Sequence, residues 1–78
     1  MKKVSIYSTP SCHFCAMAKE FFKENNVSYE EFNVAVDTEK CTEMIQKSGQ
    51  MGVPVIDIDG KIIVGFDQGE ISKILGIK

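Results

Sequence analysis

The chain has 78 residues, of which 44% are hydrophobic and 26% are charged, a balance typical of one small globular domain spanning 1–78. Its nine basic residues are all lysines spread along the sequence, and the net charge of −2 argues against nucleic-acid binding, which needs a clustered basic surface. No run approaches the ~20 apolar residues of a membrane span, and no signal-peptide core follows the first residues. We therefore expect a cytoplasmic monomer without nucleic-acid or membrane partners, whose cysteines serve chemistry rather than structural disulfides.

The first half of the chain predicts two strands joined by a helix. Residues 3–7 include β-branched side chains and end at a turn, which indicates a short strand. Apolar residues recur at helical spacing over 12–25, and Asn25 and Asn26 should end this helix. A second strand is predicted over 27–34. Because two strands joined by a crossover helix are usually parallel, we expect these two to pair in parallel.

The middle of the chain predicts a second helix and a β-hairpin. Asp37 can cap a helix over 38–48, which Gly49 should end. Two apolar runs at 54–58 and 61–64 flank an Asp-Gly pair, which is a strong signal for a tight hairpin turn.

A last short helix is predicted near the end of the chain. Asp67 followed by Glu70 resembles a capping box, and Gly76 should end the helix. The complete order is then βαβ–α–ββ–α. This order predicts an α/β fold with a four-stranded mixed sheet and three helices on its faces.

The segment Cys12-His13-Phe14-Cys15 opens the first predicted helix. A thiol in the first turn of a helix faces free backbone N–H groups and the positive end of the helix dipole, which both favour thiolate. Thiolate attacks disulfides, and a second thiol one turn later can resolve the mixed disulfide that forms. We therefore predict that Cys12 is the attacking thiol. Cys15, which should be more buried and have a higher pKa, is the predicted resolving thiol.

A metal site is the alternative use of this cysteine pair. A closed zinc site needs four ligands, whereas the chain has three cysteines and one histidine. Cys41 lies in a separate predicted helix, on a face that it shares with apolar residues. We therefore expect no bound metal or other cofactor, and we interpret Cys41 as a buried apolar residue rather than a third redox thiol.

The two residues between the cysteines each have two interpretations. His13 favours the Cys12 thiolate if it is protonated, and it is a polar spacer if it is neutral. Phe14 is either an aromatic residue at the rim that contacts the substrate or a cover for the cysteine pair. The first role is favoured because a Phe14 facing the core would compete with Cys15.

Two later segments are candidates for substrate binding. The Val53-Pro54 bond can be cis, and a cis proline at the start of a strand leaves the Val53 backbone free to pair with an extended substrate. The alternative is an ordinary strand-initiating proline. In Gly65-Phe66-Asp67, a helix N-terminus preceded by glycine can accept a carboxylate, and Asp67 can contact an amino group. Asp67 also fits a role as a helix cap, and both roles are compatible.

These segments together resemble the glutaredoxin family. The Cys-x-x-Cys pair, the Val-Pro pair and the Gly-x-Asp turn fall in the order and at the spacing of that family, over nearly the whole chain. The resemblance implies a minimal thioredoxin fold with a cis Pro54 facing the cysteines. It further implies a thiol–disulfide oxidoreductase that reduces protein or glutathione mixed disulfides. Glutathione would then contact the Val53 backbone and, through its γ-glutamyl end, the turn at 65–68.

The chain departs from the family pattern at several positions. Thr9 stands where many members have Lys or Arg, Gly52 where many have Thr or Ser, and Gln68 replaces the second acid of an Asp-Asp pair. His-Phe also replaces the usual Pro-Tyr between the cysteines. These changes reduce the glutathione contacts and leave the dithiol intact.

The resemblance therefore leaves the electron donor open. The donor is either glutathione, as reductant or co-substrate, or a thioredoxin-reductase-type flavoenzyme. The second choice fits the glutaredoxin-like redoxins that serve ribonucleotide reductase. A metal or iron–sulfur carrier that uses Cys12 and Cys15 as soft ligands is an alternative from a different class.

Overall fold

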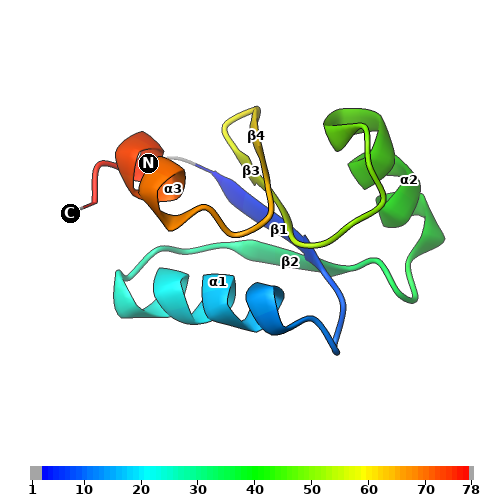
Figure 1. The fold of residues 1–78 in the computed structure, drawn as a ribbon, viewed down its shortest axis with the longest axis horizontal. Coiled ribbons are helices and arrows are strands. Elements are labelled where there is room, and N and C mark those ends of the chain that lie inside the picture. The colour runs from blue at the N-terminus through cyan, green and yellow to red at the C-terminus, as the bar shows by residue number, and fades with distance from the viewer. Residues whose placement is uncertain (1–2, 78) are drawn as a thin grey trace.

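The computed structural model describes residues 3–77, which form four strands and three helices (Figure 1). In chain order, the elements are β1 (Val4–Ser8), α1 (His13–Glu24), β2 (Glu30–Asn33), α2 (Thr38–Ser48), β3 (Val55–Ile58), β4 (Lys61–Val64) and α3 (Gln68–Leu75). Within this described part of the chain, no helix is long and apolar enough to cross a membrane.

The strands form one mixed sheet in the order β2-β1-β3-β4. β1 is parallel to β2 and antiparallel to β3, and β3 is antiparallel to β4. Tyr7 lies opposite Phe32 on one side and Val55 on the other. The structure thus confirms the predicted α/β class and the four-stranded mixed sheet with three helices.

The alternation of side chains along the strands divides the core into two layers. On one face of the sheet, buried strand residues pack against α1 and α3, and on the other face they pack against α2. The first layer contains Val4, Ile6, Ala18, Phe21, Phe22, Ile56, Ile58, Ile63 and Ile71, and the second is built around Tyr7, Met44 and Val55. Cys41 packs against this second layer but is only half-buried, whereas the sequence predicted a buried residue. That Cys41 is not a third redox thiol stays a prediction.

Side-chain caps fix where the second and third helices begin. The Asp37 carboxylate accepts a hydrogen bond from the backbone N–H of Lys40 at 3.1 Å, and Asp67 accepts one from the N–H of Glu70 at 3.1 Å. The left-handed glycines at 49 and 76 end the same two helices. Both predicted N-caps and both predicted C-caps are therefore confirmed.

The second strand is shorter than the predicted 27–34. Asn26 has a φ of 57°, and the N–H of Val27 donates to the carbonyl of Phe22 at 2.8 Å. The chain therefore folds back along α1 before it joins the sheet at Glu30. Val27 and Tyr29 are apolar because they pack against the first core layer, and their spacing therefore predicted a longer strand than the structure has.

The hairpin forms where the Asp-Gly pair predicts it. Asp59 and Gly60 have φ values of 50° and 91°, the left-handed pair that a two-residue turn of type I′ requires. The Asp57 carboxylate accepts a hydrogen bond from the Gly60 N–H at 2.8 Å, which fixes the turn from within the strand. β3 begins at Val55, so Pro54 precedes the strand.

Candidate active site

Cys12 is the N-cap residue of α1. Its Sγ atom accepts a hydrogen bond from the backbone N–H of Cys15 at 3.2 Å, and its own N–H donates to the carbonyl of Thr9 at 3.2 Å. The residue is half-buried, so part of its surface is open to a reactant. The sulfur thus lies at the N-terminal end of α1 and satisfies one of the backbone N–H groups that a helix start leaves free.

Cys15 lies one turn further along α1 and is fully buried, with 0% of its surface exposed. Burial, together with the hydrogen bond and charge interaction with the Cys12 side chain, raises the pKa of its thiol to about 12. The predicted difference between an accessible first thiol and a protonated, buried second thiol is therefore present in the structure. All three cysteines are free thiols.

The sequence did not predict a polar cluster of Ser8, Lys19 and Glu31, whose lysine lies near enough to Cys15 to affect its pKa. Lys19 Nζ and Ser8 Oγ each donate to Glu31 Oε2 at 2.8 Å. These two hydrogen bonds hold the pKa of the Glu31 carboxyl below its usual range. The Lys19 charge in turn slightly lowers the pKa of Cys15, against the larger effect of burial.

The peptide bond between Val53 and Pro54 is cis, as the family resemblance implied. The N–H of Gly65 donates to the carbonyl of Pro54 at 2.8 Å, and Gly65 has a left-handed φ of 80°. This bond joins the turn after β4 to the segment before β3. It brings together the two stretches that the sequence singled out for substrate binding.

A groove of about 480 Å³ runs between these stretches and the start of α1. We call it the Pro54 groove. Phe14, with 57% of its surface exposed, belongs to its lining, which places this side chain at the rim as predicted. The lining includes Phe14, Val53, Pro54, Val64, Gly65 and Asp67.

Residues 4–63 match the glutaredoxin family model. The chain belongs to the glutaredoxin family. It is 49% identical over 72 residues to an uncharacterised glutaredoxin-like 8.6 kDa protein in a rubredoxin operon of Clostridium pasteurianum, covering 92% of this chain and 96% of that protein. It is 37% identical over 67 residues to glutaredoxin 3 of Escherichia coli, covering 86% of this chain and 81% of that protein.

The fold of this glutaredoxin-family protein is also that of known thioredoxin-like structures. A crystal structure of a mutant of the thioredoxin-like protein BC3987 superposes with a TM-score of 0.92 at 36% identity and covers 100% of both chains. The implied thioredoxin fold is thereby confirmed. Membership of the family supports a thiol-redox function.

The remaining predicted site residues take the following positions. His13 is exposed, and its ring meets that of Phe14 edge to face with centroids 5.8 Å apart. Asp67 is the N-cap of α3, and its contact with a substrate amino group stays a prediction. Within residues 3–77, no group of three or more His, Cys, Asp or Glu side chains is arranged to hold a metal ion.

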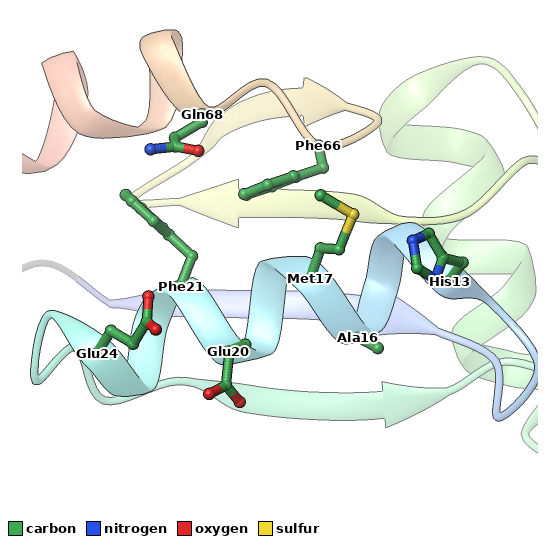
Figure 2. Close-up of a pocket in the computed structure, with 8 residues that line it drawn as sticks. All are labelled: His13, Ala16, Met17, Glu20, Phe21, Glu24, Phe66 and Gln68. Atoms are coloured by element: carbon green, nitrogen blue, oxygen red, sulfur yellow. The ribbon is translucent and has the colours of Figure 1, made fainter.

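A second groove, of about 490 Å³, lies along α1 and was not predicted (Figure 2). We call it the α1 groove. Met17 is one of the apolar residues at helical spacing in α1, yet 40% of its surface is exposed in this groove. The sequence shows the helical spacing of Met17 and Phe21. It does not show that Phe66, from a distant segment, forms the opposite wall of the groove.

Proposed function

We propose that the protein is a thiol–disulfide oxidoreductase that reduces protein disulfides or glutathione mixed disulfides with Cys12 and Cys15. The observation that carries the proposal is the contrast between the two thiols. Cys12 is accessible and accepts a hydrogen bond at a helix N-terminus, whereas Cys15 is buried with a pKa of about 12. The proposal includes a monomer acting in the cytosol, where thiols are kept reduced.

The reaction proceeds in two sulfur exchanges. The Cys12 thiolate attacks one sulfur of the substrate disulfide, and the other sulfur leaves as a thiolate that takes up a proton. Cys15 then loses its proton and attacks Cys12 Sγ, which releases the second substrate thiol. The substrate has gained two electrons and two protons, and the protein has become a Cys12–Cys15 disulfide.

The buried position of Cys15 suits this order of events. In the reduced protein, the Cys12 side chain contributes to the raised pKa of Cys15 through a hydrogen bond and through charge repulsion. Once Cys12 is part of a mixed disulfide, its sulfur carries no charge and both contributions are lost. Cys15 therefore becomes easier to deprotonate only after the first exchange has taken place.

A thioredoxin-reductase-type flavoenzyme is a second candidate for the electron donor, beside glutathione. Glutathione carries two carboxylates at neutral pH, and no lysine among residues 3–77 lines the Pro54 groove. Thr9 and Gln68 stand where many members of the family have a cation and an acid that contact glutathione. These features favour a donor that recognises the protein surface.

The proposal is tested by supplying each donor separately. The protein is incubated with bis(2-hydroxyethyl) disulfide and NADPH, together with either glutathione and glutathione reductase or thioredoxin reductase alone. NADPH oxidation that depends on the protein and is lost in Cys12→Ser supports the proposed activity and identifies the donor. Absence of turnover with both donors would contradict it.

A further inference from the structure

The α1 groove has an apolar floor that no part of the described chain covers. The rings of Phe21 and Phe66 meet edge to face, with centroids 5.9 Å apart. Met17 extends from α1 toward Phe66 beside them, and 40% of its surface is exposed (Figure 2). Exposed methionine next to aromatic rings forms an adaptable apolar surface, of the kind that accepts varied side chains from a partner.

The edge of this groove is acidic. Glu20 and Glu24 lie one turn apart on α1, where like charges repel each other. In Figure 2, Glu24 lies beside Phe21, and the Glu20 carboxylate points to the side of α1 opposite Phe66. Among residues 3–77, neither carboxylate takes part in an ion pair, and Lys19 of the same helix is paired with Glu31.

The α1 groove is continuous with the reactive end of the protein. It begins at His13, directly after Cys12, and shares Phe66 and Gln68 with the Pro54 groove. From residue 13 to residue 24, the helix rises about 16 Å, at about 1.5 Å per residue. An extended peptide covers this length with about five residues.

We propose that the α1 groove binds the extended segment of a protein substrate that flanks the cysteine attacked by Cys12. An apolar side chain of that segment packs on Met17 and Phe66, and a lysine or arginine about four to six residues from the attacked cysteine lies against Glu20 and Glu24. The inference rests on the proposed function, because the disulfide exchange at Cys12 brings this segment to the groove. The groove should select a cationic side chain because its edge is acidic.

The test compares three kinds of disulfide, five compounds in all, in the same assay. Two are heptapeptides with cysteine at one end and leucine near it. One has two lysines at the far end and the other has two glutamines. The cysteine of each forms a mixed disulfide with 2-mercaptoethanol. Each is made in both chain directions, because the groove does not fix the peptide polarity. The third is bis(2-hydroxyethyl) disulfide, which is too small to reach the acidic edge.

The wild-type protein should show a lower KM for the lysine peptide than for the glutamine peptide in at least one direction. Because exposed ion pairs are weak, a difference of about two- to tenfold is expected, and it should shrink in high salt. Glu20→Gln/Glu24→Gln should remove the difference in KM with kcat unchanged. The double variant should reduce bis(2-hydroxyethyl) disulfide at the wild-type rate.

The matched control is Glu30→Gln/Glu39→Gln, which changes the net charge equally with two exposed acids outside the groove. It should keep the preference for the lysine peptide. Reduction of the small disulfide without any lysine preference, or a preference that survives Glu20→Gln/Glu24→Gln, would overturn this inference and leave the proposed function intact. Failure to reduce the small disulfide would overturn the proposed function itself, and this inference with it.

Discussion

The backbone N–H of Cys15 donates a hydrogen bond to Cys12 Sγ over 3.2 Å, so the first thiol of the motif caps the helix that contains the second. The same local geometry that begins α1 therefore places a donor on the reactive sulfur. One turn of helix separates an accessible thiol from one with no exposed surface. Helix capping and thiol chemistry thus depend on one short segment.

The two thiols of the motif should differ strongly in their reaction with alkylating agents. At pH 8, iodoacetamide should modify Cys12 and leave Cys15 unmodified, because Cys15 is buried and its pKa of about 12 keeps it protonated. Peptide mapping by mass spectrometry distinguishes the sites, and denaturation in urea should make Cys15 reactive. Equal rates at both cysteines in the folded protein would contradict the assignment.

The role of Asp67 can be separated from simple capping by comparison with Asp37. Both carboxylates cap helices with the same 3.1 Å geometry, but only Asp67 lines the Pro54 groove. Replacement of either by alanine should lower the free energy of unfolding by about 1 kcal/mol, measured by urea denaturation. Only Asp67→Ala should also raise KM for a glutathione mixed disulfide.

The Asp37→Ala variant serves as the control for stability in that comparison. If both variants lose stability and neither changes KM, Asp67 is a cap alone. A higher KM in Asp37→Ala would mean that the loss of stability, rather than a substrate contact, affects catalysis.

The free energy of unfolding in acid should depend on the cluster of Ser8, Lys19 and Glu31. Hydrogen bonds from Lys19 and Ser8 lower the pKa of Glu31 from 4.5 in the folded protein. The ionised carboxylate therefore adds to the free energy of unfolding above pH 4.5, and this contribution is lost as the pH falls through the lowered pKa of the folded protein. Because Lys19 and Glu31 are partly exposed, this contribution should be at most about 1 kcal/mol. Glu31→Gln should therefore reduce the loss of stability between pH 5 and pH 3, measured by thermal denaturation in that interval. An unchanged pH profile would mean that the pair contributes nothing to folding.

Local signals account for most of what the sequence predicted correctly. Asp37, Asp67 and Gly49 act through hydrogen bonds or dihedral angles within their own turn, and the Asp-Gly hairpin does the same. The position of Cys12 at a helix start was predictable for the same reason. The family resemblance predicted that the Val53-Pro54 bond is cis, whereas the Val-Pro pair by itself allowed either cis or trans.

The features that the sequence missed all depend on distant segments. Met17 has helical spacing with Phe21, yet its exposure is decided by where Phe66 lies after β4. The cluster of Ser8, Lys19 and Glu31 joins two strands and a helix, and no pattern within any one of them predicts it. Contacts of this kind appear only when the sheet order is known.

The most direct test of the proposed mechanism is to map the mixed disulfide that forms before resolution. Cys15→Ser should accumulate a stable adduct with a disulfide substrate, and mass spectrometry should locate it on Cys12, because the proposed resolving thiol is absent. Cys12→Ser should form no adduct on Cys15, which is buried. An adduct on Cys15 in the Cys12→Ser protein, or full turnover by that variant, would contradict the assignment of Cys12 as the attacking thiol.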